Sequence, residues 1–304
     1  MGAYILRRTV QVVPVLLGVS ILAFLISHLV PGDPVTVMLG QQGTAEQAAM
    51  LREELGLNDP IYVQYARFIS NAVQGDLGRS IRSGQPVLSE IGERFGTTLS
   101  LTVVAVVAAA IVGMSLGIAA AASGPLGDSA IMAFALLGIS MPYFWSGILL
   151  ILLFGLTLDW LPVAGSGWKA MILPAITLAA PAAAVLARMT RSTMLEVLNQ
   201  DFVRTARAKG LRERIVILRH VLKNALIPVV TIIGLQFGGL LAGSVIVESV
   251  FSRPGLGRYT VTAIQSRDFP QIQGIVLVTA AIYVFVNLAV DLLYAVLDPR
   301  IRYR

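Results

Sequence analysis

Cysteine is absent from this chain of 304 residues, and histidine occurs only twice, at His28 and His220. Without thiols the chain can form no disulfide, no cysteine-ligated metal site and no thiolate nucleophile, and the redox compartment leaves no mark on the sequence. Two imidazoles are also too few for a histidine-rich metal centre. We therefore expect no metal site in this chain.

The sequence also lacks the loop by which many ATPases hold nucleotide. No stretch reads Gly-x4-Gly-Lys-Ser/Thr, in which backbone amides and the lysine bind phosphates. The glycine-rich segment from 234 to 243 lies inside an apolar run and contains no lysine, so close helix packing explains it better. The sequence predicts a chain that is not an enzyme on its own and that binds no cofactor itself.

Charged residues are scarce, at 13% of the chain, whereas hydrophobic residues make up 56%. This apolar surface is more than one soluble core of the same length could bury, so a bilayer is the natural solvent for the excess. The net charge of +6 could suggest nucleic acid, but the lysines and arginines lie between long apolar runs rather than on a soluble face. We expect a membrane protein with no nucleic-acid partner.

Six runs are long enough to cross the roughly 30 Å hydrocarbon layer as helices, which takes about 20 residues each. They are Thr9–Val30, Leu99–Ala122, Ala130–Leu158, Ala170–Ala187, Leu226–Val247 and Gly274–Ala295. The predicted fold class is therefore all-α integral membrane, with about six transmembrane helices.

Two of these runs invite a second interpretation. The first follows Arg7 and Arg8 like a signal peptide, but its apolar stretch is longer than the usual hydrophobic region of a signal peptide and no small-x-small cleavage site follows, so it is interpreted as an uncleaved anchor. The third is interrupted by the segment from Gly138 to Pro142, which predicts a bend or break. Such a bend suits a helix that lines a pathway, and a simple packing kink explains it equally well.

Lysine and arginine in the loops predict the orientation. The segment from Arg188 to Lys223 holds nine basic and three acidic residues, whereas the segment from Pro31 to Thr98 holds eight acidic residues and five arginines. Placing both termini in the cytoplasm puts the first segment inside and the second outside. The predicted divisions are residues 1–30, a tail and first span; 31–98, a small external helical cap; and 99–304, a core of five spans with the cytoplasmic segment 189–228.

The external segment carries helix signals of its own. Thr44 with Gln47 predicts a capping box that opens a helix closed by Gly56. Asp59 followed by Pro60 predicts the start of a second helix, which ends near Gly75.

The segment 189–228 contains an apolar stripe at helical spacing, formed by Leu195, Leu198, Phe202 and Ala206. Gly210 can end this helix in a left-handed conformation. The stripe predicts a short amphipathic helix from about Leu198 to Leu211. From composition alone, such a helix could equally lie on anionic lipid or dock on a partner protein.

Two stretches of this segment resemble a known family. They are Asp201-Phe202-Val203-Arg204-Thr205-Ala206-Arg207-Ala208-Lys209-Gly210-Leu211 and Arg219-His220-Val221-Leu222-Lys223-Asn224-Ala225-Leu226-Ile227-Pro228. They look like the cytoplasmic loop of peptide-type ABC importer permeases, a branch that includes dipeptide, oligopeptide, glutathione and nickel importers. Of the general pattern Glu-Ala-Ala, three residues, Gly, the second Ala and the Gly match Ala206 and Gly210. Arg204 and Thr205 depart from it, in the manner of the peptide branch.

Further landmarks of these permeases occur in order along nearly the whole chain. They are Pro31-Gly32-Asp33-Pro34, Leu55-Gly56-Leu57, Gly75-Asp76-Leu77-Gly78, Pro254-Gly255-Leu256-Gly257 and the tail from Asp298 to Tyr303. The resemblance implies a type I ABC importer permease of the bacterial inner membrane. It implies as partners a homologous second permease, two ATP-binding cassette subunits that use ATP and Mg, an external substrate-binding protein and membrane lipid.

The resemblance also implies a coupling helix that seats in a groove of the ATPase subunit. The residues carried over to this role are Asp201, Arg204, Thr205, Ala206, Arg207, Lys209, Gly210 and Leu211. Arg204, Arg207 and Lys209 are expected to pair with acidic residues at the rim of that groove.

Candidate pathway-lining or hinge residues are Met141, Pro142, Pro181, Gln236 and Glu248. Ionisable residues within spans are functional candidates by default, and here they are His28, Glu248 and Asp291. Each falls near the end of a span, from which we expect it to reach the membrane interface.

Other functions remain open from the sequence. An ion-coupled secondary transporter predicts carboxylates near mid-membrane and an inverted repeat, and neither is evident. A lipid-binding scaffold would use only the basic loop. Within the family, short peptides rank first as substrates, glutathione second and nickel third.

Overall fold

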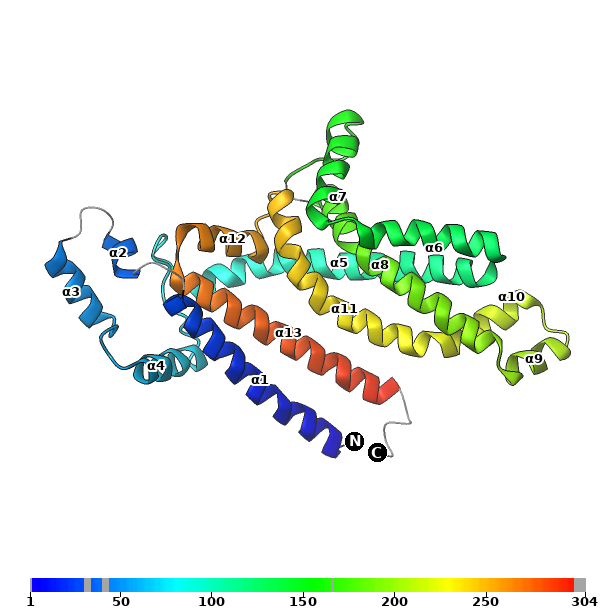
Figure 1. The fold of residues 1–304 in the computed structure, drawn as a ribbon, viewed down its shortest axis with the longest axis horizontal. Helices are drawn as coiled ribbons and strands as arrows, with labels where there is room; N and C mark the ends of the chain where they lie inside the picture. Colours follow the sequence, from blue (N-terminus) through cyan, green and yellow to red (C-terminus); the bar gives the residue numbers. More distant parts are fainter. Residues whose placement is uncertain (1, 30–33, 40–43, 166, 298–304) are drawn as a thin grey trace. The chain divides into compact units, whose positions relative to one another are not determined.

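The structure is a computed structural model that describes residues 2–29, 34–39, 44–165 and 167–297 (Figure 1). Helices account for most of the described residues. They are α1 (Gly2–Leu29), α2 (Pro34–Leu39), α3 (Ala45–Glu54), α4 (Ile61–Val73), α5 (Val87–Ala122), α6 (Pro125–Ser140), α7 (Tyr143–Leu150), the π-helix η2 (Ile151–Thr157), α8 (Lys169–Leu198), α9 (Asp201–Ala208), α10 (Glu213–Ile215), the π-helix η3 (Val216–Val221), α11 (Leu222–Val250), α12 (Leu256–Ser266) and α13 (Phe269–Leu297). Residues 31–33 of the first turn landmark and the tail from 298 lie outside the described residues.

Five helices in the described residues are long and apolar enough to cross a membrane, and a bent pair brings the number to six. The five are Arg7–Ile26, Val87–Ala122, Lys169–Leu198, Pro228–Val250 and Phe269–Val290. The pair is Pro125–Ser140 with Tyr143–Thr157. Each matches one of the six predicted runs, so the all-helical membrane architecture is confirmed.

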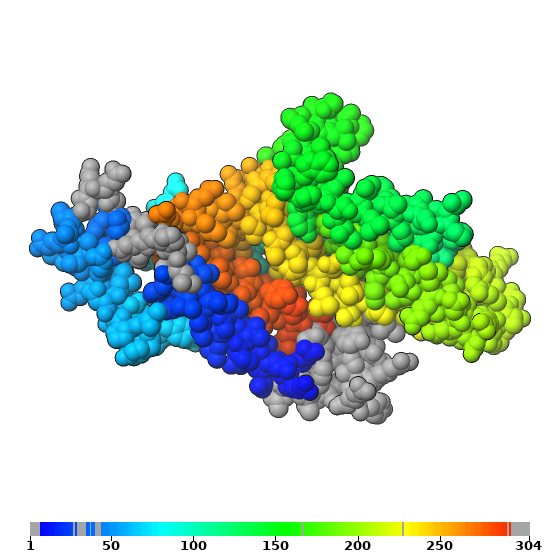
Figure 2. Space-filling view, in the orientation of Figure 1, coloured from blue at the N-terminus to red at the C-terminus, as the bar shows by residue number. Residues whose placement is uncertain are grey.

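The break predicted in the third run lies at Met141 and Pro142, where α6 and α7 meet at 104°. Met141 is extended, with φ −94° and ψ 124°, because a following proline disfavours helical backbone. Pro142 then becomes the residue before α7, where its missing N–H is of no consequence. Figure 2 shows α7 and η2, in green, standing out from the rest of their unit. Their exposed side chains include Phe144, Trp145 and Ile148.

The chain divides into two compact units. Among the described residues, the first comprises Leu99–Arg253 with residues 289–297, and the second comprises those of Gly2–Thr98 with Pro254–Leu288. By this division, the predicted cap groups with the first span and with residues 254–288.

The first unit is built around α8, whose buried side chains are mostly small. Its core joins Leu101 and Ala105 of α5 to Leu178 and Leu186 of α8 and Val247 of α11. The helix continues through Pro174 and Pro181. Neighbouring helices that pack on both sides make such interruptions tolerable within a membrane.

Close approach between α5 and α8 depends on Gly113 and Gly117. A Cβ at either position would lie 2.6 Å from a backbone carbonyl of α8, that of Ala183 or Ala187. Gly113 to Gly117 has the Gly-x-Ser-x-Gly spacing of hydrolase nucleophile turns, but it lies inside a helix and not on a strand-to-helix turn. The spacing therefore serves helix packing.

The second unit contains the two cap helices expected from the sequence. The capping box is confirmed, with the Gln47 amide donating to Thr44 Oγ1 over 3.2 Å and the Thr44 amide donating to Gln47 Oε1 over 3.1 Å. The start of the second helix differs from the prediction, since Pro60 and not Asp59 is the cap residue. Asp59 instead forms an ion pair with Arg67 at 2.6 Å. The short helix α2 was not predicted.

Candidate functional site

The segment between α8 and α11 folds as a short helix, a glycine turn and a return toward α11 (Figure 1). Helix α9 covers only Asp201–Ala208, because α8 runs on to Leu198 and Gln200 is extended, with ψ 151°. The predicted stripe is therefore wrong in part, since Leu195 and Leu198 belong to α8. Phe202, which was expected in the stripe, is 39% exposed.

The buried face of α9 consists of Val203 and Ala206, which are 0% and 6% exposed. They pack in a cluster with Met194 of α8, Val216 and Val221 of η3, and others from the start of α11. Burying a valine side chain contributes about 1.5–3 kcal/mol. Two contacts spaced three residues apart thus fix α9 against the ends of α8 and α11 through apolar packing.

The turn after α9 confirms the predicted left-handed glycine. Gly210 has φ +76°, and its amide donates to the carbonyl of Arg207 over 2.9 Å. A Cβ at this position would meet no atom within 4 Å. Glycine is required here by the backbone conformation and not by a close contact within the chain.

Charges around the turn are partly satisfied within the chain. Arg207 donates to Glu213 through Nη2 at 2.6 Å and through Nε at 3.1 Å. These hydrogen bonds raise the pKa of Arg207 and lower the pKa of Glu213. Arg204 approaches Asp201 at 3.7 Å, with both side chains exposed. Arg207 therefore closes the turn within the chain, and its expected pairing with a partner stays a prediction.

The remaining surface of α9 and the turn that follows it are exposed. The exposed residues include Asp201, Phe202, Arg204 and Thr205 of α9, and Lys209 and Leu211 of the turn. This surface, which we call the α9 face, combines charge with two exposed apolar side chains, Phe202 and Leu211. Such a composition suits a contact with another protein.

Among the candidate pathway residues, Met141 lies at a cavity and Pro142 follows it at the bend between α6 and α7. Met141 lines an apolar cavity of about 430 Å³ between α5, α6, α7 and α8, together with Val112, Phe134, Ser146 and Ile176. Pro181, Gln236 and Glu248 are not among the residues that line it. The cavity adjoins the bend at Pro142, and its wall is almost wholly apolar.

Glu248, which was expected near the membrane interface, is fully buried within the protein. The amide of Arg253 donates to the Glu248 carbonyl over 2.9 Å, and the Arg253 side chain, 8% exposed, donates to the carbonyl of Ala170 over 3.3 Å. Burial lowers the pKa of Arg253, and the negative charge of Glu248 opposes that effect. Two opposite buried charges at the end of α11 partly compensate each other.

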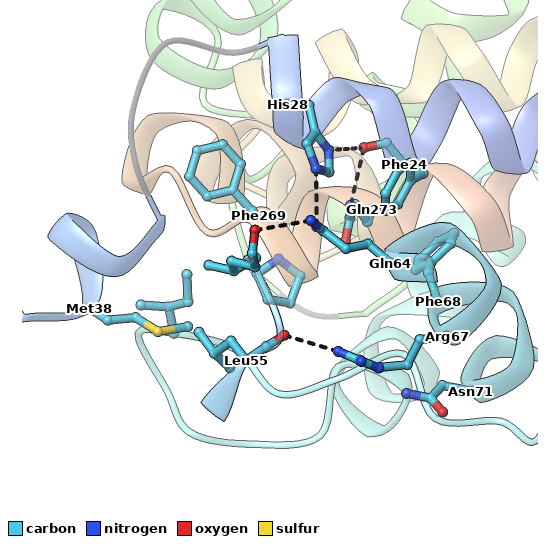
Figure 3. A pocket seen from close by; sticks show the side chains of 13 residues that line it. Phe24, His28, Met38, Leu55, Gln64, Arg67, Phe68, Asn71, Phe269 and Gln273 are labelled. Carbon is cyan, nitrogen blue, oxygen red and sulfur yellow. Dashed lines mark hydrogen bonds between the residues drawn. The ribbon is translucent and has the colours of Figure 1, made fainter. Parts of the chain in front are cut away.

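His28 lines a pocket of about 240 Å³ in the second unit (Figure 3). One ring nitrogen lies 3.2 Å from the carbonyl of Phe24 and the other lies 3.3 Å from Gln64 Oε1. The contact with Gln64 ties α1 to α4. The side chain of Asp291, the third ionisable candidate, lies outside the described residues.

An ion pair that was not predicted from the sequence joins α6 to α8. Both oxygens of Asp128 accept hydrogen bonds from Arg191. The partners are 63 positions apart, and no local pattern links them. Such pairing can be found only from the packing of the two helices.

Comparison with known proteins places these features in a family. Residues 112–303 match the model of the binding-protein-dependent transport system inner membrane component, and residues 1–102 match its N-terminal counterpart. The glutathione transport system permease protein GsiC of Escherichia coli O6:H1 is 48% identical over 99% of both chains. GsiC of Salmonella paratyphi A is 47% identical over the same shares.

Solved structures agree on the fold. An amino acid ABC transporter with histidines aligns over 70% of this chain and 94% of its own, with 19% identity and a TM-score of 0.53. The inward-facing MetNI methionine ABC transporter aligns over 68% and 96%, with 17% identity and a TM-score of 0.55. The chain belongs to the binding-protein-dependent transport system inner membrane components, and it is a multi-pass permease subunit of the peptide-type ABC importers.

Proposed function

We propose that this chain forms half of the pathway of an ATP-driven importer for glutathione and related short peptides. The observation that carries the proposal is the 48% identity with a glutathione permease over 99% of both chains. The sequence alone ranked glutathione second to other short peptides, and the relatives raise it to first. A homologous second permease would supply the other half, and an external binding protein would deliver the substrate.

Energy would enter through the α9 face, seated on an ATP-binding cassette subunit that uses ATP and Mg. The helix is suited to this task because Val203 and Ala206 fix it to α8, η3 and α11. A displacement of α9 would therefore move α8 and α11 with it as a rigid body. Arg204 and Lys209, which are exposed, would pair with acidic residues of the ATPase, while Arg207 maintains the turn.

The proposal includes an orientation in the inner membrane. Both termini and the α9 segment would lie in the cytoplasm, and the segment 34–98 would lie outside. The nine basic residues between Arg188 and Lys223 support this arrangement, since cytoplasmic loops of membrane proteins are enriched in lysine and arginine.

An ion-coupled transporter is the alternative function, and it would need a carboxylate such as Glu248 to bind the transported ion. A carboxylate that binds a transported ion has to exchange with solvent. Glu248 is instead fully buried, with the charge of Arg253 nearby. This arrangement favours a structural role for the carboxylate.

The test is uptake of labelled glutathione into proteoliposomes that contain the complete complex and its binding protein. Val203→Asp should abolish ATP-dependent uptake, because it places a charge in the apolar cluster beneath α9. Val73→Asp is the matched control, since Val73 is 83% exposed on α4.

A second variant covers the case in which Val203→Asp fails to fold. Arg204→Glu combined with Lys209→Glu changes only exposed side chains. It should uncouple ATP hydrolysis from transport while the assembled complex persists. Undiminished uptake by this double variant and by a folded Val203→Asp would overturn the coupling role. Uptake without ATP would favour the ion-coupled rival.

A further inference from the structure

The second unit contains an open cleft of about 490 Å³, which borders Pro254 and Gly255 of the fourth landmark and is lined largely by polar and charged residues. Three arginines and one glutamate are among the residues that line it. Arg82 comes from the loop before α5, Arg94 from α5 and Arg258 from α12. We call this feature the arginine cleft. Its charged side chains leave an excess of positive charge around an open depression.

The floor of the arginine cleft is a hydrogen-bonded network centred on Glu90. The Tyr259 hydroxyl donates to Glu90 Oε2 over 2.5 Å, and Gln271 Nε2 donates to the same oxygen over 2.9 Å. Burial, together with the adjacent Glu90, raises the pKa of Tyr259 well above its usual range, so its hydroxyl keeps its proton. The Glu90 carboxylate is thus hydrogen-bonded within the unit by Tyr259 and Gln271.

Arg94 is held in a defined position on this floor. Its guanidinium carbon lies 4.3 Å from the centroid of the Tyr259 ring, and Nη1 donates to the Glu90 carbonyl over 2.7 Å. Stacking on an aromatic ring and a fixed hydrogen bond restrict the side chain before any ligand arrives. Arg94 also lies within ion-pair distance of two carboxylates of this chain, that of Glu90 at 3.8 Å and that of Glu93 at 3.7 Å. The net positive charge of the lining is therefore assigned to Arg82 and Arg258.

The loop that carries Arg82 is also fixed, by the buried Asp268. Asp268 Oδ2 accepts from Ser80 Oγ over 2.7 Å and from the Arg82 amide over 3.2 Å. Ser80 and Asp268 are 3% and 1% exposed, while the Arg82 side chain is exposed. The backbone is therefore anchored in the interior of the unit, and the cationic side chain is presented at its surface.

We propose that the arginine cleft is the docking site for carboxylate side chains of the external substrate-binding protein. The inference rests on the proposed function, because that orientation places both the segment 34–98 and the segment between α11 and α13 outside. Carboxylates are the natural partners, since arginine binds them through paired hydrogen bonds. A protein surface fits better than a free peptide, because sites for small ligands bury most of the ligand, and this cleft is open.

Docking through exposed arginines acts mainly on the rate of association. Complementary charges steer the two proteins together, and salt screens this attraction. The binding protein should therefore associate with the complex faster at low ionic strength than at high ionic strength. The effect of ionic strength on the association rate should require Arg82 and Arg258.

The experiment measures association of glutathione-loaded binding protein with the complete complex in lipid nanodiscs by stopped-flow fluorescence. Arg82→Glu combined with Arg258→Glu should slow association on the order of tenfold at low salt, with little difference at high salt. Arg267→Glu is the matched control, because Arg267 is exposed in the same unit and does not line the cleft. ATP hydrolysis without the binding protein should stay unchanged in all variants, which separates this proposal from the coupling role of α9.

An equal loss from Arg267→Glu, or an unchanged rate in the double variant, would overturn the proposal. Saturable binding of free glutathione or dialanine to the nanodisc complex, lost with Arg82→Glu, would show a substrate site instead. Because the chain contains no cysteine, Arg82→Cys also offers a single attachment point for a photo-reactive probe. The probe should capture the binding protein, and failure to capture it would count against docking at this cleft.

Discussion

Exchanging the charges of Arg207 and Glu213 tests whether Arg207 serves the ion pair with Glu213 within the chain or a contact with the ATPase subunit. The pair has two short contacts, at 2.6 Å and 3.1 Å, but its side chains are 43% and 55% exposed. After solvent screening, a surface pair of good geometry contributes about 0.5–1 kcal/mol, or about a two- to fivefold change in the population of the closed turn. Either single reversal should therefore lower binding-protein-stimulated ATP hydrolysis by about that factor.

The exchanged variant, Arg207→Glu with Glu213→Arg, should recover most of this loss because the attraction is restored. The pKa of Glu213 is lowered by Arg207, so this carboxylate is charged above the ordinary carboxyl range and the pair is lost only as the pH falls through its folded pKa. An assay near pH 7 thus tests the formed pair. If the exchanged variant is as impaired as Arg207→Glu and Glu213→Arg alone is harmless, then Arg207 serves the partner and its role in the ion pair within the chain is refuted.

Three further predictions follow from backbone, packing and ionisation. Gly210→Ala should reduce stimulated ATP hydrolysis by about fivefold through left-handed strain of about 1 kcal/mol, and Gly210→Asn should reduce it less. Equal rates for the wild-type protein and both variants would contradict the left-handed turn. Gly113→Ala should lower the free energy of unfolding in detergent by about 1–3 kcal/mol, because its Cβ would lie 2.6 Å from the Ala183 carbonyl oxygen. Gly96→Ala on the same helix has open space around its Cβ and should leave the free energy of unfolding unchanged. Because the pKa of Tyr259 is raised on folding, its contribution to stability should be fully present below pH about 10, the usual tyrosine pKa, and should be lost only at higher pH. An ultraviolet titration compared with that of Tyr259→Phe should show no ionisation of Tyr259 below pH about 10.

Local signals in the sequence were sufficient for much of the architecture. Span length follows from bilayer thickness, and each apolar run had to form a helix because lipid offers no hydrogen bonds to the backbone. The break between α6 and α7 follows from a single dipeptide, Met141-Pro142. The capping box at Thr44 likewise needs only residues three positions apart.

The candidate site was predictable in place but not in detail. The left-handed Gly210 is a local requirement, and its position was correctly predicted. Of the buried face of α9, Ala206 was predicted as part of the apolar stripe. Val203 was not predicted, because it is covered by Val216 and Val221 of η3, which no helical period within α9 can reveal. The partners of Arg207 and Glu248 depend in the same way on side chains brought close by the fold.

The central claim is that α9 contacts the ATPase subunit, and site-directed crosslinking tests it most directly. The chain has no cysteine, so Thr205→Cys on the α9 face and Gln74→Cys at the end of α4 each provide one thiol for a photo-reactive probe. In the assembled complex, the probe at position 205 should crosslink to the ATP-binding cassette subunit and the probe at position 74 should not. Crosslinking of the ATPase from position 74, or none from position 205, would contradict the account.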